Sequence, residues 1–134
     1  MTDDQKPVDP GDVIRTGSPE STVDRVADFY GAYIDAVYDG TDGLGRELRA
    51  HYLTEELRRR LADWEETNHA DGVLRAQNVP LQWEVRYSDS GAGHAFTVVT
   101  LTWGGGTDPE RTRLAIQSDL ATRLISDIKE STDG

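Results

Sequence analysis

Two aspartates in apolar surroundings are the residues of this sequence best suited to act as a general base. Asp71 precedes a Val-Leu pair, and Asp127 stands between two isoleucines. Burial beside apolar side chains would fit such a carboxyl group to accept a proton from a substrate. The alternatives are structural: a cap or turn residue for Asp71 and a surface strand position for Asp127. Because the chain holds 25 acidic residues, a carboxylate near a pocket is weak evidence, and we assign no catalytic residue.

Aromatic side chains at helix and strand spacing could line a binding cavity. Tyrosine offers apolar area together with one hydroxyl that can orient a ligand. The ligand-binding candidates are four aromatic residues and two polar residues near the rim: Tyr30, Tyr33, Trp64, Trp103, Asp71 and Gln77. The same spacing is typical of an ordinary core. We expect Trp64, which closes a helical stripe, and Trp83, in the middle of a strand, to be largely buried.

The sequence lacks the patterns of a metal or cofactor site. His51, His69 and His94 are too widely spaced to form a His-x-x-x-His pair, and the chain has no cysteine. The aspartates of the glycine-rich segment at 39–45 do not fit an EF-hand, and neither a phosphate-binding Gly-Lys loop nor a Gly-x-Ser-x-Gly motif occurs. We therefore predict no metal site and no cofactor.

The charge balance argues against nucleic acid as a partner. With 14 basic residues against the 25 acidic ones, the net charge of −11 repels a phosphate backbone and an anionic membrane surface. The run Arg58-Arg59-Arg60 is interpreted as a solvated helix face, with an anion site as the alternative. No apolar run is long enough to cross a membrane. We expect a soluble, cytoplasmic protein, with a removed upstream export or anchor segment as the alternative.

A chain of 134 residues is long enough for one folded domain. Residues 1–17 are rich in Asp, Pro and Gly and predict a disordered acidic arm. Residues 18–130 predict the single domain, and residues 131–134 a disordered tail.

The helices are predicted from capping signals and apolar periodicity. Ser18 followed by Pro19 starts a helix whose apolar stripe runs from Val23 to Val37. The glycine-rich segment at 39–45 predicts a mobile loop. Two short helices follow, one on each side of Thr54.

The period then changes to two, which predicts strands. The expected strands run from Leu81 to Tyr87, from Ala95 to Trp103 and around 112–116, with turns at 88–94 and 104–109. The last apolar segment, around Arg123 to Ile128, fits a helix and a strand equally well. Helices followed by antiparallel strands predict an α+β domain with the helices packed on one face of the sheet.

Three short elements resemble a bacterial branch of the nuclear-transport-factor-2-like superfamily whose function is undefined. They are Phe29-Tyr30 with Tyr33, then Tyr52-Leu53-Thr54 with Leu57, then Asp71, Ala76-Gln77 and Pro80. The resemblance spans roughly residues 18–128. It implies a cone, in which helices pack into a strongly curved antiparallel sheet with a cavity at the open end, and it favours a strand for the last segment. The chain departs from the pattern there, since the usual Gly and Trp are missing.

The superfamily fold serves enzymes, binding modules and toxin-immunity proteins, so the fold does not select a function. Our first hypothesis is a non-catalytic binding or protein-interaction domain that uses the cone cavity or the sheet face. The alternatives are a cofactor-independent lyase or isomerase, with Asp71 or Asp127 as base and a tyrosine as oxyanion donor, and an immunity-type inhibitor of a basic toxin. Expected partners are an unknown protein or a small apolar ligand, with a homodimer through the sheet face as a further hypothesis.

Overall fold

The structure, a computed structural model, describes residues 19–40, 42–104, 107 and 109–131. The predicted acidic arm and all of the predicted tail except Ser131 lie outside these residues. The domain is α+β, as predicted, and contains three helices followed by four strands: α1 (Pro19–Asp39), α2 (Asp42–Tyr52), α3 (Glu55–Asn68), β2 (Gln82–Gly91), β3 (His94–Trp103), β4 (Glu110–Asp119) and β5 (Ile125–Glu130).

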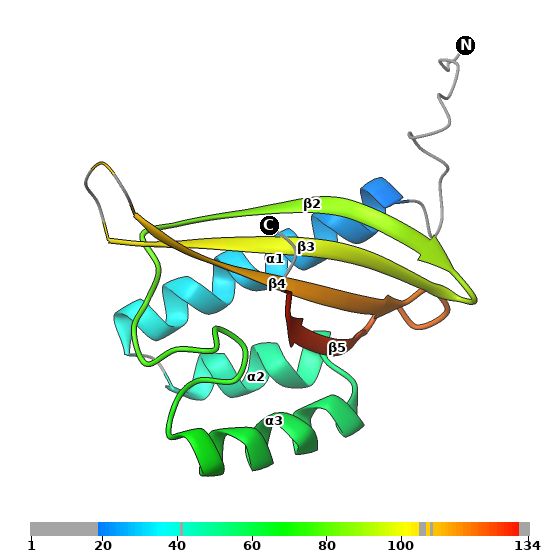
Figure 1. Cartoon of the computed structure of the whole chain (residues 1–134). Helices are drawn as coiled ribbons and strands as arrows, with labels where there is room; N and C mark the ends of the chain where they lie inside the picture. The colour runs from blue at the N-terminus through cyan, green and yellow to red at the C-terminus, as the bar shows by residue number, and fades with distance from the viewer. Residues whose placement is uncertain (1–18, 41, 105–106, 108, 132–134) are drawn as a thin grey trace.

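The strands form one antiparallel sheet in the order β2-β3-β4-β5, and the helices cover one of its faces (Figure 1). α1 runs beneath β2 and β3, whereas α3 packs near β5. No helix in the described ranges is long and apolar enough to span a membrane. The opposite face of the sheet carries no helix of the described chain, and we call it the open face.

The core lies between the helices and the inner face of the sheet. α1 begins at Pro19, as predicted, and its stripe contributes Val26, Phe29 and Tyr30. The other fully buried side chains come from the junction of α2 and α3, from α3, from the loop after α3 and from the strands; the largest are Leu53, Leu57, Leu61, Leu74, Leu101, Leu114, Ile116, Ile125 and Ile128. These side chains pack the space between the helices and the sheet.

The prediction of a mobile loop at 39–45 is wrong, because α2 already begins at Asp42. Gly40 ends α1 with a left-handed φ of 73°, and its N–H donates to the carbonyl of Val37 over 3.1 Å. The half-buried side chains Leu48 and Tyr52 pack the helix against the core. Packing of one apolar face thus outweighs the low helix propensity of the two glycines in its first turn.

The prediction of two helices separated at Thr54 is confirmed. Thr54 caps α3, since its Oγ1 accepts a hydrogen bond from the backbone N–H of Leu57 over 3.1 Å. The end of α2 is tied to the last strand by a parallel bridge between Leu53 and Ile125. This bridge holds the junction of the two short helices against the sheet.

The first two strands are joined by a two-residue hairpin and not by the seven-residue turn predicted at 88–94. Ala92 and Gly93 both have positive φ, 53° and 83°, which is the backbone of the turn that best matches the twist of a hairpin. A register shift between Tyr87 and Asp89 lets the strand continue to Gly91.

The ambiguous last segment is a strand. Ile125 and Ile128 are both buried although they are three positions apart, a spacing that mimics a helix. A register shift opposite Gln117 and Ser118 makes this possible, because the extra residue turns both isoleucines to the same face.

The expectation that both tryptophans are largely buried is wrong. Trp83 is 37% exposed, since β2 is an edge strand with a neighbouring strand on one side only, and its indole lies against Gly31 of α1. Trp64 is half-buried, and the guanidinium group of Arg75 lies 4.6 Å from the centroid of its ring.

The contact between Gly31 and Trp83 yields a stability prediction. A Cβ at Gly31 would lie 2.9 Å from the Trp83 ring, whereas one at Gly45 would lie 3.6 Å from Tyr33, an ordinary contact. Both substitutions to Ala gain up to about 1 kcal/mol of helix propensity. We expect Gly45→Ala to raise the free energy of unfolding. Gly31→Ala should not raise it, because the close contact cancels the gain in helix propensity, and it should shift the indole N–H resonance of Trp83. Equal stabilisation with an unmoved resonance would contradict the close contact.

Candidate functional site

The guanidinium group of Arg49 joins all three helices and the loop that follows them. Its Nη2 donates to the Tyr33 hydroxyl over 2.7 Å and to Glu65 Oε2 over 2.5 Å, and its Nε also reaches the Tyr33 hydroxyl, at 3.2 Å. Asp71 Oδ1 lies 3.5 Å from Nη2. The side chains of Arg49, Glu65 and Asp71 are only 17–26% exposed, so water weakens these contacts much less than it would at the surface.

Asp71 is the turn residue that the structural alternative predicted. Its Oδ1 accepts hydrogen bonds from the backbone N–H groups of Val73, at 2.8 Å, and Leu74, at 3.1 Å. Its Oδ2 accepts the Tyr33 hydroxyl proton over 2.6 Å. The carboxylate therefore shapes the loop and fixes Tyr33 at the same time.

A hollow of about 460 Å³ opens beside this network, between α1, α2 and the end of α3. Tyr33 and Asp71 both lie in its lining, so the structure brings together the two residue types that the enzyme hypothesis needs. However, the Tyr33 hydroxyl donates to Asp71 and accepts twice from Arg49, which uses all of its hydrogen-bonding capacity. A hydroxyl in this state has no free proton to offer an oxyanion.

The environment also opposes ionisation of the phenol. Burial raises the pKa of Tyr33 far above its ordinary range, and the nearby Asp71 charge raises it further. Burial alone would lower the pKa of Arg49, but its hydrogen bonds to Glu65 and Tyr33 raise it above the ordinary range. At neutral pH the pair is therefore a neutral phenol and a permanently charged guanidinium group.

The remaining cavity candidates lie apart from this hollow. Tyr30 is fully buried, and its hydroxyl donates to the Val73 carbonyl over 3.0 Å. Trp103 packs against the core, with Nε1 donating to Thr112 Oγ1 over 2.9 Å. Gln77 is exposed and binds the carbonyl of His69, while Trp64 lies under Arg75. The six candidates thus do not line one shared cavity.

Asp127, the second candidate base, takes part in a surface ion pair. Its Oδ1 accepts from Arg60 Nη1 over 2.9 Å, and Lys129 Nζ lies 3.5 Å from its Oδ2. Among the described residues, no group of three or more His, Asp or Glu side chains could hold a metal ion.

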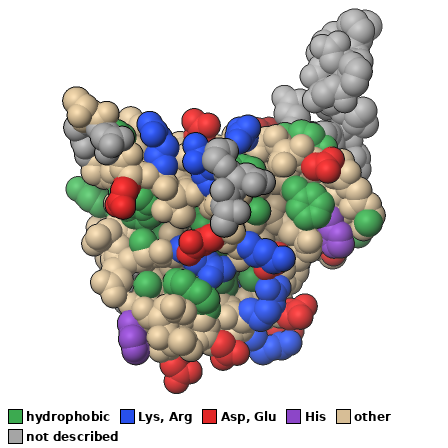
Figure 2. All heavy atoms as spheres, in the orientation of Figure 1, with side chains coloured by type: hydrophobic (Ala, Val, Ile, Leu, Met, Phe, Trp, Pro, Cys, Tyr) green, Lys and Arg blue, Asp and Glu red, His purple; other side chains and the backbone are tan. Residues whose placement is uncertain are grey.

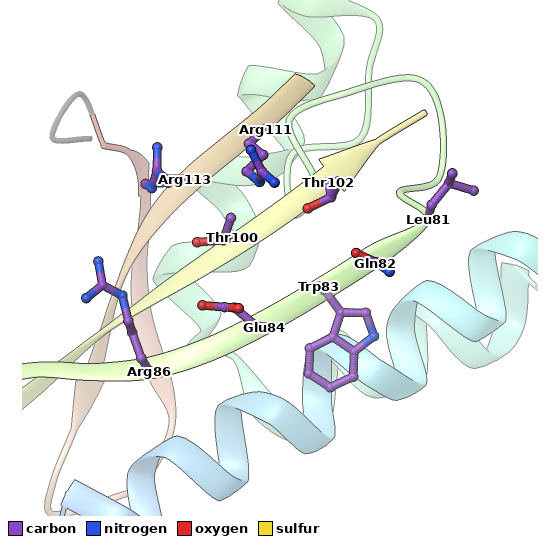
Figure 3. Close-up of a pocket in the computed structure, with 9 residues that line it drawn as sticks. All are labelled: Leu81, Gln82, Trp83, Glu84, Arg86, Thr100, Thr102, Arg111 and Arg113. Atoms are coloured by element: carbon purple, nitrogen blue, oxygen red, sulfur yellow. The ribbon is translucent and has the colours of Figure 1, made fainter. Parts of the chain in front are cut away.

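A larger hollow, of about 740 Å³, lies on the open face of the sheet. Figure 3 shows side chains from β2, β3 and β4 that project to the same side of the strands. The lining residues are Leu81, Gln82, Trp83, Glu84, Arg86, Thr100, Thr102, Arg111 and Arg113. Trp83 is the exception in direction, because its indole points toward α1. We call this hollow the sheet-face groove.

The strand register places the charged residues of the groove in rows. Glu84 pairs with Thr100, and Thr100 pairs with Arg113, so these three side chains cross the sheet in one line. Arg111 lies two positions before Arg113 and therefore on the same face. The threonine side chains of β3, which lie between these residues, are short. They leave space between Glu84 on β2 and the two arginines on β4.

The three arginines of the groove lack acidic partners. In the part of the chain that the structure describes, Arg86, Arg111 and Arg113 form no ion pair, as is also true of Arg46 and Arg58, whereas Arg49, Arg59 and Arg60 do. What sets the three apart is that they share one hollow. Figure 2 shows Lys and Arg side chains gathered over the strands, with an acidic side chain among them. Unpaired arginines in a hollow of a protein with a net charge of −11 form a local basic patch.

This patch was missed in the sequence. The outward positions of the first strand are also typical of an ordinary solvated face, and Arg111 and Arg113 flank the first residue of the predicted third strand. The alternation of Arg and Thr from Arg111 to Arg113 was the available signal, because residues two apart share a sheet face. That Arg86 lies in the same hollow as Arg111 and Arg113 can be predicted only when the register of the three strands is known.

Comparison with known proteins gives information on the fold but not on the chemistry of the site. The structure is similar to the crystal structure of a protein of unknown function from Bacteroides thetaiotaomicron, with a TM-score of 0.65, 20% sequence identity, and coverage of 83% of this chain and 90% of that chain. No protein-family model and no curated protein matches the chain. At this identity the likeness shows a shared fold alone.

The Arg49 network yields a stability prediction. Arg49→Met leaves Glu65 and Asp71 without their cation in a partly buried site, and we expect it to lower the free energy of unfolding by about 3 kcal/mol. The control is Arg59→Met on α3, whose pair with Glu55 is exposed, with an expected loss of under about 0.5 kcal/mol. Urea denaturation at neutral pH measures both. Similar small losses would show that the network does not hold the helices.

The buried phenols predict a loss of stability at alkaline pH. Because the folded-state pKa of Tyr33 is raised above the ordinary 10.0, its contribution is fully present below pH 10.0 and declines as the unfolded chain ionises above it. Tyr33→Phe should therefore flatten the fall in unfolding free energy between about pH 10 and pH 11.5. Between pH 7 and pH 9 the two proteins should differ by a constant. An unchanged slope above pH 10 would refute the assignment.

Proposed function

We propose that the chain is a non-catalytic binding domain that uses the sheet-face groove to recognise an anionic partner. The observation that carries the proposal is the cluster of Arg86, Arg111 and Arg113, whose side chains face the groove without an ion-pair partner among the described residues. Charges that stabilise a fold are usually paired, whereas free arginines in a hollow are typical of sites that bind carboxylate or phosphate groups.

The polar network in the helical hollow supports a structural role more than catalysis. Its hydroxyl and carboxylate groups already satisfy one another, and Asp71 also holds the backbone of its own loop. A general base has to reach a substrate proton, and this carboxylate would first have to release Tyr33 and the loop. The groove makes no such demand, since its side chains are available as they stand.

We also propose that the fold belongs to the cone-shaped nuclear-transport-factor-2-like class. The order of three helices followed by an antiparallel sheet, with the helices on one face only, supports this assignment. In such an arrangement the sheet face opposite the helices is available for partners. The proposed binding surface is therefore compatible with the proposed fold class.

Binding of poly-L-glutamate tests the function. At about 0.1 M salt, where charges more than about 10 Å apart are screened, we expect the full chain to bind this probe measurably in calorimetry. The double variant Arg111→Ala/Arg113→Ala should weaken binding by at least about tenfold, because it removes two charge-assisted contacts. Its thermal midpoint should not fall, since neither side chain has a partner to lose.

The matched control removes two charges from α3, with the double variant Arg58→Ala/Arg59→Ala. It should leave the affinity for poly-L-glutamate within about twofold, because charges outside an interface contribute little to binding. Loss of binding in Arg46→Ala, at the helical hollow, with none in the Arg111/Arg113 variant would move the site to that hollow and overturn the proposal.

A further inference from the structure

We infer that the occupant of the sheet-face groove is an extended segment of a partner protein in which Asp or Glu residues alternate with other residues. The inference rests on the proposed function and specifies the partner. Its basis is the spacing of the charges in the groove.

Two of the arginines define a repeat along β4. Arg111 and Arg113 are two positions apart on the same face, so their Cα atoms lie roughly 7 Å apart along the strand. In an extended segment, acidic residues at positions i and i+2 have the same separation and also face the same way. A segment running along β4 can therefore place one carboxylate on each arginine.

The third arginine and the glutamate also bear on which partner fits the groove. Arg86 lies on β2, two strands and roughly 10 Å from β4, so it offers a cation to one side of a segment that runs along β4. Glu84 faces Arg113 across Thr100 and repels a continuous polyanion laid over the centre of the groove. A peptide avoids this conflict, because its neutral positions and amide donors can lie over Glu84.

The composition of the groove also favours a protein. Arginine is enriched in protein interfaces, and Leu81, 66% exposed at the end of the groove, offers apolar contact beside the charges. Small-molecule pockets are by contrast mostly apolar and enclosed. Nucleic acid meets the repulsion of a chain with a net charge of −11.

A second copy of the chain is a poorer occupant. Two identical grooves face to face would bring together six arginines and two glutamates, so the surfaces repel. An acidic segment complements the same surface with a few charges.

Two peptides of equal length and composition test the inference on the full-length protein. In one, Thr and Glu alternate; in the other, all Glu residues precede all Thr residues. We expect the alternating peptide to bind at least about fivefold more tightly, because only it matches the repeat of Arg111 and Arg113 in extended form. The double variant Arg111→Ala/Arg113→Ala should abolish this preference, and Arg59→Ala should preserve it.

A charge swap provides an independent readout. The variant Arg111→Glu/Arg113→Glu should no longer bind the alternating Thr-Glu peptide. It should instead bind an alternating Thr-Lys peptide, which the parent protein should not bind. A merely structural role of the two arginines would not produce this exchange of specificity.

The outcomes separate this inference from the proposed function. If both Glu peptides bind equally and both depend on Arg111 and Arg113, the groove recognises anions but not an alternating segment, and the inference fails alone. If neither peptide nor poly-L-glutamate binds, the proposed function fails. A dimer in sedimentation that Arg113→Glu dissociates would make a second copy the occupant. Tighter binding after neutralising the acidic residues of the arm would make the arm the occupant; the full-length variant is Asp3→Asn, Asp4→Asn, Asp9→Asn and Asp12→Asn.

Discussion

The partly buried guanidinium group of Arg49 is the interaction on which the helical layer depends. Two helices and one loop direct polar groups at it, through Tyr33 of α1, Glu65 of α3 and Asp71. Withdrawing these charges from water is costly, and the cost is offset only while all of the partners are in place. The helices are consequently fixed in one relative position by polar geometry as well as by apolar packing, which by itself tolerates small displacements.

This constraint divides the molecule into two parts with different chemistry. On the helical side, the polar groups of the Arg49 network hydrogen-bond to one another and stabilise the fold, so they are not available to a partner. On the open sheet face, Arg86, Arg111 and Arg113 remain available, and the rigid register of β2, β3 and β4 sets their spacing. A binding surface built on paired strands loses little backbone freedom when a partner arrives, because the backbone is already ordered.

Periodicity predicted much of the fold, and it failed where tertiary packing competes with local preference. The α1 stripe, the break between two helices at Thr54 and three of the strands followed from patterns that each element carries alone. The start of α2 did not, since its glycines argue against a helix that the core nevertheless requires. For the site, sequence placed Asp71 and Tyr33 among the candidates but could not show that they satisfy each other. The sheet-face groove could not be predicted from the sequence, because only the pairing of three strands brings Arg86 and Arg113 into one hollow.

The bridge between Leu53 and Ile125 has a consequence for the order in which the domain can be made. It joins the end of α2 to β5, and the N–H of Thr54 adds a hydrogen bond to the Ile125 carbonyl at 2.9 Å. Contacts between such distant parts of a chain form late, since a long loop must close first. During synthesis α1 can pack on β2 and β3 before β5 is made, whereas the junction of α2 and α3 obtains its strand partner only when β5 is free of the ribosome. Until then the apolar side chains of this junction lack that partner, and this is an interval in which chaperones can protect the chain.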